Sequence, residues 1–277
     1  MKYDSDLAIG VFDSGVGGIS VLAELIHRLP KEKYIYYGDS KNAPYGMRTT
    51  EEVKALSLNV VEELLKIGIK GLVVACNTAT SGVIEDLRKA IDIPIVGMEP
   101  ALKPAVELNK AGKIIVMATP VTLREKKFNN LIQCFDNRNK IIKLPCPGLV
   151  EIIEKNGGRG EEIRQYLHNL FKEINIEEID SIVLGCTHYI FIKEELNIMT
   201  GNRVQLIDGN RGTANQLKRL LTEENLLHME KNQGYTEITM INSLNTEDII
   251  DLSKKLLEEQ LHYLGWQGRL KYNIVDL

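Results

Sequence analysis

The chain has 277 residues, of which 44% are hydrophobic and 26% charged, as is ordinary for a globular protein of one large or two medium domains. Its formal net charge of −4 lacks the basic excess typical of nucleic-acid-binding proteins, so no nucleic-acid partner is expected. No run approaches the roughly 18 apolar residues of a membrane span, so no membrane association is expected either.

Four cysteines occur, at positions 76, 134, 146 and 186, and no two of them form a Cys-x-x-Cys pair. The first residues, Met1 to Asp6, are polar and lead directly into an apolar run, so no secretion signal is expected. The sequence therefore predicts reduced thiols in a cytoplasmic protein and no disulfide framework.

Short apolar runs alternate along the chain with segments whose apolar residues recur at three- and four-residue spacing. The apolar runs predict strands at residues 7–12, 33–37, 71–75, 93–96, 113–118, 141–144, 181–184 and 203–207. The periodic segments predict helices at residues 19–29, 50–67, 81–91, 160–174 and 246–263. Repeated strand and helix predict an α/β fold, with mostly parallel sheets flanked by helices.

The two halves of the chain resemble each other. Residues 73–78 and 183–188 share an apolar strand, a small residue, a cysteine and then polar groups. Residues 9–15 have a similar counterpart in residues 114–120, and the spacing from each of these runs to its cysteine is also similar. The pattern indicates two α/β units of one plan, although buried parallel strands also resemble one another by chance because all are rich in Val and Ile.

Polar clusters follow several of the predicted strands. They are Asp13-Ser14-Gly15, Asp39-Ser40, Cys76-Asn77-Thr78 and Cys186-Thr187-His188. Ligands of open α/β sheets bind at the carboxyl ends of the strands, so these clusters contain candidate site residues. Each polar residue could instead be a helix N-cap, which is the preferred interpretation of Ser14, Ser40 and Thr78 taken singly.

Cys76 and Cys186 each end an apolar strand and precede a predicted helix start. A helix N-terminus favours the thiolate through its unpaired N–H groups and its dipole. Two such thiols in matching positions suit racemisation, in which one group removes an α-proton and another delivers a proton to the opposite face. Cys134 and Cys146 are interpreted as small buried apolar side chains.

Other kinds of site could use the same residues. Cys186 and His188 could bind a metal, but no second pair has zinc-like spacing. The same two residues could form the nucleophile and base of a hydrolase, which leaves Cys76 unexplained. A dinucleotide site would use the glycine-rich residues 15–18, but Ser20 stands where the fingerprint needs its third glycine.

Five segments together resemble the glutamate racemase family, within the aspartate/glutamate racemase superfamily. They are residues 10–18, 37–39, 43–46, 74–79 and 184–189, and the resemblance runs from about residue 8 to about residue 207. It implies interconversion of L- and D-glutamate by two cysteines, without pyridoxal phosphate, metal or other cofactor. This reaction supplies D-glutamate for peptidoglycan. It further implies that the protein binds a small-molecule substrate, L- or D-glutamate, and that it forms a homodimer.

The family fold has two pseudo-symmetric α/β domains with the active site in the interdomain cleft. Carried onto this chain, the resemblance predicts a first domain of residues 1–97 and 208–277 and a second domain of residues 98–207. The sequence departs from the family pattern at three places. Ile190 replaces a common proline, and the segments 98–103 and 208–211 also differ. They lie beside the motifs, so the expected chemistry is unchanged, and oligomer contacts and fine substrate preference are left open.

By resemblance, Cys76 deprotonates D-glutamate and Cys186 deprotonates L-glutamate, with Asp13 and His188 assisting them. Glu151 falls where the family has an assisting glutamate, although the helix dipole also favours an acid in a first turn. The residues expected to hold the substrate are Asp13, Ser14, Pro44, Tyr45, Gly46, Asn77, Thr78, Thr119, Thr122, Thr187 and His188.

Two further functional alternatives stay open. Aspartate racemases share the two-thiol chemistry but usually differ directly after each cysteine, so the segments Cys-Asn-Thr-Ala-Thr and Gly-Cys-Thr-His-Tyr favour glutamate. The alternative of a different class is a protein that acts mainly by docking on another enzyme, as some family members are reported to do with DNA gyrase.

Overall fold

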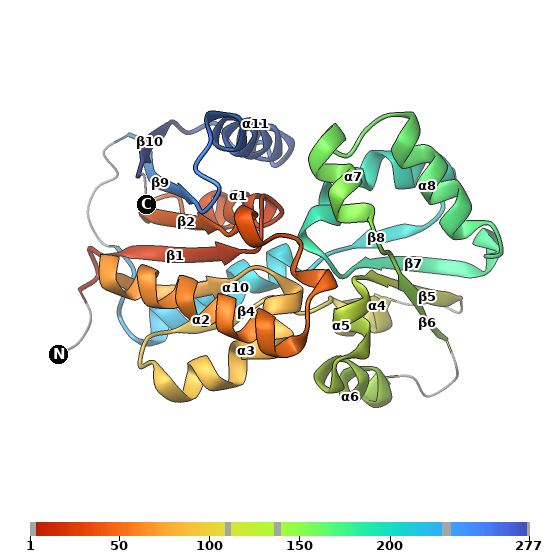
Figure 1. The fold of residues 1–277 in the computed structure, drawn as a ribbon, viewed down its shortest axis with the longest axis horizontal. Coiled ribbons are helices and arrows are strands. Elements are labelled where there is room, and N and C mark those ends of the chain that lie inside the picture. The colour runs from red at the N-terminus through yellow and green to blue at the C-terminus, as the bar shows by residue number, and fades with distance from the viewer. Residues whose placement is uncertain (1–3, 109–111, 136–139, 229–233, 276–277) are drawn as a thin grey trace. The chain divides into compact units, whose positions relative to one another are not determined.

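The computed structural model describes residues 4–108, 112–135, 140–228 and 234–275 (Figure 1). The chain divides into two compact units. The first contains the described residues up to Tyr45, Thr50–Met98 and those from Asn210 onward; the second contains Gly46–Thr49 and the described part of Glu99–Gly209. The sequence-based division assigns residues 46–49 to the first domain, whereas here their contacts group them with the second unit.

The first unit is built on a six-stranded sheet in the order β10-β9-β2-β1-β3-β4, in which every pairing is parallel. Its strands are β1 (Ala8–Asp13), β2 (Tyr34–Gly38), β3 (Ile69–Val74), β4 (Ile95–Gly97), β9 (Thr236–Asn242) and β10 (Leu270–Ile274). Its helices are α1 (Ile19–Arg28), α2 (Thr50–Ile67), α3 (Asn77–Ala90), α10 (Asn210–Glu223) and α11 (Glu247–Tyr263). Short 3-10 helices follow β2 at η1 (Ser40–Asn42) and η2 (Tyr45–Met47).

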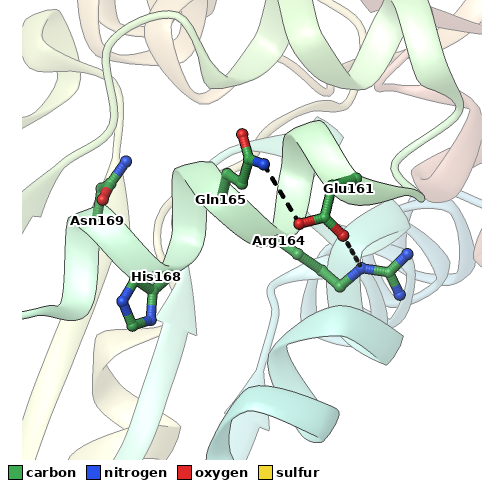
Figure 2. Close-up of a pocket in the computed structure, with 5 residues that line it drawn as sticks. All are labelled: Glu161, Arg164, Gln165, His168 and Asn169. Atoms are coloured by element: carbon green, nitrogen blue, oxygen red, sulfur yellow. Dashed lines mark hydrogen bonds and ion pairs between the residues drawn. The ribbon is translucent and has the colours of Figure 1, made fainter.

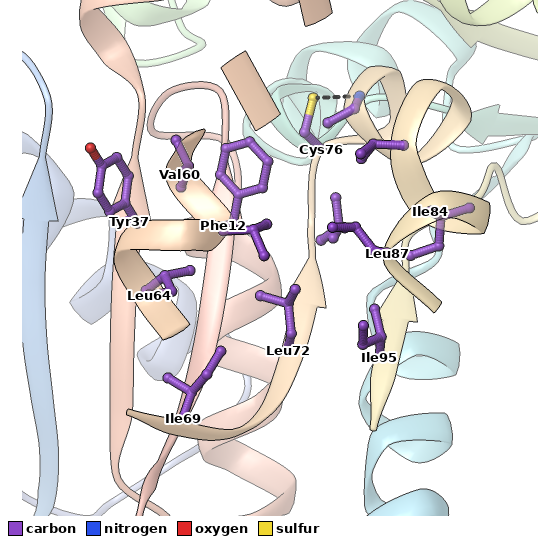
Figure 3. Packing of buried hydrophobic residues seen from close by; sticks show 14 of the residues in the cluster. Phe12, Tyr37, Val60, Leu64, Ile69, Leu72, Cys76, Ile84, Leu87 and Ile95 are labelled. Atoms are coloured by element: carbon purple, nitrogen blue, oxygen red, sulfur yellow. Dashed lines mark hydrogen bonds between the residues drawn. The ribbon is translucent and has the colours of Figure 1, made fainter. Parts of the chain in front are cut away.

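Helices cover both faces of this sheet. α1 packs against α10 and α11, and α2 packs against α3 (Figure 1). The core shown in Figure 3 joins strand residues such as Phe12 and Leu72 to helix residues such as Leu64 and Leu87, all of them buried. Parallel strands bury both faces, which explains their near-continuous apolar sequences. Cys76 lies at the edge of this core, where the chain passes from β3 into α3 (Figure 3).

The second unit has a four-stranded parallel sheet in the order β6-β5-β7-β8. Its strands are β5 (Lys113–Ala118), β6 (Ile141–Pro145), β7 (Ile179–Leu184) and β8 (Gln205–Ile207). Its helices are α4 (Leu102–Leu108), α5 (Pro120–Arg124), α6 (Lys126–Phe135), α7 (Leu149–Asn156), α8 (Glu161–Phe171) and α9 (Lys193–Thr200), with 3-10 helices η3 (Ile176–Glu178) and η4 (Thr187–Ile192).

Each sheet has a topological switch point beside its first strand. β1 pairs with β2 on one side and β3 on the other, and β5 pairs in the same way with β6 and β7. Phe12 is opposite Val74 in one sheet, and Met117 is opposite Leu184 in the other. Ligands of such sheets bind where the strand order reverses. The predicted α/β class and the similarity of its two halves are confirmed.

None of the helices in the described part of the chain combines the length and the apolarity that a membrane crossing needs.

Candidate active site

Cys76 is the N-cap residue of α3. Its backbone is extended, with φ −65° and ψ 118°, and its sulfur accepts a hydrogen bond of 3.4 Å from the Ala79 N–H (Figure 3). The thiol also donates to Ser14 Oγ, 3.5 Å away. The side chain is only 6% exposed. Because the helix N-terminus presents N–H donors and a positive dipole end to the sulfur, it favours the thiolate form of Cys76.

Asp13 ends β1, next to the strand that leads to Cys76. Its carboxylate is fully buried and accepts a hydrogen bond of 3.0 Å from the Gly15 N–H. A Cβ atom on Gly18 would lie 2.5 Å from Asp13 Cβ and 3.2 Å from Ala75 Cβ, so only glycine fits there. The loop therefore brings the start of α1 against Asp13, which accounts for the glycine at position 18.

Three other predicted residues of the first unit are buried near this strand edge. Asn77 and Thr78 open α3, and the Asn77 side-chain amide donates to the Met98 carbonyl at 3.5 Å. The Tyr45 hydroxyl donates to Asp39 Oδ2 at 2.6 Å. Burial, followed by the hydrogen bond to Asp39, raises the pKa of Tyr45 well above its ordinary value. Tyr45 is therefore a neutral, fixed side chain.

Cys186 occupies the equivalent position in the second unit. It lies two residues after β7 and directly precedes η4, as Cys76 lies two residues after β3 and directly precedes α3. Its side chain is 9% exposed, and its sulfur lies 3.9 Å from His188 Nδ1. The two thiols thus follow the corresponding strands of the two sheets, and each is nearly buried.

His188 connects Cys186 to a carboxylate. Its Nε2 atom lies 2.8 Å from Glu154 Oε1, on α7. Burial lowers the pKa of His188, but the hydrogen bonds to Cys186 and Glu154 and the charge of Glu154 together raise it well above its ordinary value. A protonated His188 would stabilise a Cys186 thiolate, and Glu154 would stabilise the protonated ring.

Glu154 was missed by the sequence analysis, which assigned the assisting carboxylate to Glu151. Glu151 is in the first turn of α7 and is exposed. Glu154 is one turn further along and follows Val150 by four positions, so it adjoins the buried side of the helix formed by Leu149, Val150 and Ile153. The spacing of these apolar residues was the signal that could have identified Glu154. An assisting role for Glu151 stays a prediction.

The remaining predicted residues also lie close to the ends of strands. Thr119 caps α5: its Oγ1 accepts from the Thr122 N–H at 3.2 Å and lies 3.0 Å from Thr122 Oγ1. Thr187 is buried beside Cys186. A Cβ on Gly46 would lie 2.8 Å from Thr119 Cβ, so the backbone at Gly46 passes directly over this threonine.

Pro44 follows a cis peptide bond in the loop that leads to Tyr45.

The two other cysteines differ in burial. Cys146 is buried, as predicted, and burial raises the pKa of its thiol well above its ordinary value. Cys134 is exposed on α6, so the prediction that it is buried was wrong. It follows the buried Ile132 by two positions, which places it on the opposite side of the helix.

The described residues contain no group of three or more His, Cys, Asp and Glu side chains arranged to hold a metal ion. A surface hollow of about 450 Å³ lies against α8 and is lined by Glu161, Arg164, Gln165, His168 and Asn169 (Figure 2). Gln165 and Arg164 both bind the Glu161 carboxylate there (Figure 2). None of these five side chains was predicted as a site residue, and none is a thiol.

Comparisons with known proteins agree with one another. A sequence model of the Asp/Glu/hydantoin racemase family matches residues 9–217. The glutamate racemase of Clostridium novyi (strain NT) is 57% identical over 253 residues, which cover 91% of this chain and 97% of that protein. Glutamate racemase isoform RacE1 from Bacillus anthracis has a similar structure, with a TM-score of 0.81 and 30% identity over 100% of this chain and 99% of that one.

The glutamate racemase from Francisella tularensis subsp. tularensis SCHU S4, solved in complex with D-glutamate, also has a TM-score of 0.81, with 25% identity and 98% of each chain covered. The fold, the family match and these relatives agree along most of the sequence. The chain therefore belongs to the Asp/Glu/hydantoin racemase family.

Proposed function

We propose that this protein is a glutamate racemase, which interconverts L- and D-glutamate with Cys76 and Cys186 as its two acid/base groups and needs no cofactor. The observation that carries the proposal is the equivalent placement of the two thiols, each after a corresponding strand and at the start of a helix. The relatives named glutamate racemase and the D-glutamate bound to the Francisella tularensis enzyme support the choice of substrate. The D-glutamate product would serve peptidoglycan synthesis.

The proposed reaction transfers one proton at each face of the α-carbon. The thiolate of Cys186 removes the α-proton of L-glutamate, the electron pair of the broken C–H bond stays on carbon, and the Cys76 thiol protonates the opposite face. In the other direction Cys76 is the base and Cys186 the acid. Buried donors that already point at the developing charge stabilise such an intermediate more than water does.

The neighbouring groups would tune the two thiols. Asp13 assists Cys76, and His188, held by Glu154, assists Cys186. Glu151 is the second candidate for an assisting carboxylate in the second unit. The side chains and backbone groups proposed to bind the amino and carboxylate groups of glutamate are those of Ser14, Pro44, Tyr45, Gly46, Asn77, Thr78, Thr119, Thr122 and Thr187.

The proposal includes a homodimer in the cytoplasm, by resemblance to the family. A reducing compartment would keep both reactive thiols free. Sedimentation equilibrium tests the dimer: a species of twice the chain mass supports it, and a species of the chain mass contradicts it.

Hydrolysis by Cys186 is the second candidate. The thiol of Cys186, the imidazole of His188 and the carboxylate of Glu154 are arranged as in an activated nucleophile. Circular dichroism with L-glutamate, D-glutamate, L-aspartate and D-aspartate separates the candidates, after dialysis against a chelator and removal of pyridoxal phosphate. Loss of optical activity from both glutamate enantiomers supports the proposal. Reaction of aspartate alone would make the substrate wrong. A separate assay of ammonia release from glutamine tests the hydrolase, and release without any racemisation would favour it.

A further inference from the structure

The loop between β2 and Tyr45 is held by Asn242, the last residue of β9, and by Ser243, which follows it. The Asn242 side-chain amide donates to Ser40 Oγ at 2.8 Å. Ser243 makes two contacts: its Oγ accepts from the Lys41 N–H at 3.0 Å, and its own N–H donates to the Gly38 carbonyl at 3.0 Å. These bonds join Asn242 and Ser243 to the last residue of β2 and to the first part of the loop. We call Asn242 and Ser243 the β9 clamp.

The β9 clamp is tightly packed. Gly38 pairs with Asn242 across the β2–β9 ladder, and a Cβ on Gly38 would lie 2.8 Å from Asn242 Nδ2. Asn242 is 3% exposed, and its Oδ1 accepts from the Leu244 N–H at 3.0 Å. Loss of a hydrogen-bond partner destabilises the fold more when the amide is buried than when it is exposed. The Asn242 side chain is therefore held in one orientation.

A chain of hydrogen bonds leads from the clamp to a proposed substrate-binding residue. Ser40 and Lys41 begin η1, which ends at Asn42. Asn42 Nδ2 donates to both carboxylate oxygens of Asp39, at 3.0 and 3.1 Å. Asp39 in turn accepts the Tyr45 hydroxyl at 2.6 Å. The Asp39 backbone N–H donates to the Asp13 carbonyl at 2.9 Å, so η1 contributes to the position of the Asp39 carboxylate, and this carboxylate holds the Tyr45 hydroxyl.

We propose that Asn242 and Ser243 are positioning residues for the racemase reaction, because they fix the loop of residues 39–45 and so orient Tyr45 toward glutamate. The inference rests on the proposed function, since it takes Tyr45 as a substrate-binding residue. Both residues act through the loop. Neither belongs to the motifs that identified the candidate site from sequence.

Steady-state kinetics with both glutamate enantiomers tests the proposal. Ser243→Ala removes the acceptor of the Lys41 N–H, and Asn242→Ala removes the bond to Ser40. Each should raise KM about 3- to 10-fold, the size expected for one net hydrogen bond. The value of kcat should change much less, because Tyr45 binds substrate and transfers no proton. Ser243→Thr keeps the acceptor and should restore KM.

Thr236→Val is the matched control at the opposite end of β9. It removes a buried hydroxyl that donates to the Pro30 carbonyl at 2.7 Å, far from the loop along the strand. It should lower stability without changing KM. A KM for Ser243→Ala that equals the KM of Thr236→Val would overturn the proposal, and so would a failure of Ser243→Thr to restore it.

Amide hydrogen exchange of the unliganded protein separates this inference from the proposed function. The amides of Lys41, Asn42 and Ala43 should exchange faster in Ser243→Ala than in the wild type or Thr236→Val. If the wild type does not racemise glutamate, the proposed function fails, and exchange still reports whether the clamp holds the loop. Unchanged exchange would overturn the clamp, and faster exchange with an unchanged KM in an active enzyme would overturn its positioning role.

Discussion

His188 Nε2 lies 2.8 Å from Glu154 Oε1, while the other ring nitrogen of His188 faces Cys186 Sγ at 3.9 Å. The ring is therefore held between a carboxylate and a thiol. An ionised Glu154 fixes the proton on Nε2 and favours a second proton on Nδ1, where it can support a Cys186 thiolate. This relationship connects a residue of α7, absent from the sequence-based site, to the proposed chemistry of Cys186.

Glu154→Gln should lower the pKa of His188 and reduce stability in a pH-dependent way. The pKa of His188 is raised in the folded protein, so its contribution to stability is fully present below the unfolded value of about 6.5 and is lost as pH rises through the folded value. Urea unfolding should therefore show the largest destabilisation by Glu154→Gln near pH 6 and a smaller one at high pH.

Two further variants complete this test. Glu162→Gln changes an exposed carboxylate that binds Lys155 and Asn156, and it should show no such pH dependence. Comparison with Glu151→Gln shows which carboxylate of α7 raises the pKa of His188. If Glu151→Gln gives the pH-dependent loss and Glu154→Gln does not, the coupling inferred from the 2.8 Å contact is wrong.

Gly18→Ala should displace Asp13, because its Cβ would lie 2.5 Å from Asp13 Cβ. A shift of about 1 Å in a group that assists proton transfer can lower kcat about 10²-fold, which is the loss expected here. Gly212→Ala is the matched control, since a Cβ there meets no atom within 4 Å. Wild-type kcat in a folded Gly18→Ala protein would show that Asp13 is not held in place by this contact.

Lys70→Met should destabilise the protein strongly. Lys70 Nζ lies 2.5 Å from Glu32 Oε2, and both side chains are almost completely buried. Removal of one partner of a buried ion pair leaves the other charge unpaired and costs about 3–5 kcal/mol. Lys66→Met, which breaks the exposed pair with Glu63, is the comparison. Equal urea midpoints for the two variants would contradict the expectation.

The central strands and their polar ends were predictable from sequence, because buried parallel strands are almost wholly apolar and end abruptly in polar residues. β1 and β3, with Asp13 and Cys76 after them, show this contrast most clearly. β9 and β10 were not predicted. The edge strand β10 mixes half-buried and exposed residues, and β9 alternates at its start, so neither gives a continuous apolar run.

The candidate site was less predictable where it depends on the rotation of a helix. A sequence motif predicts that a glutamate lies near a given position. Which of Glu151 and Glu154 contacts His188 depends on which side of α7 is buried. The same reasoning applies to Cys134, whose side of α6 faces solvent. The β9 clamp could not be predicted at all, because its bonds join Asn242 and Ser243 to residues about 200 positions earlier in the chain.

The most direct test of the two-thiol account is α-deuterium exchange of each glutamate enantiomer in deuterated water, with the wild type, Cys76→Ser and Cys186→Ser. The wild type should exchange and racemise both enantiomers. Cys76→Ser should lose exchange of D-glutamate by at least about 10²-fold while Cys186 still exchanges L-glutamate, and Cys186→Ser should show the reverse. Equal losses for both enantiomers in each folded variant, or none in either, would contradict the assignment of one thiol to each face.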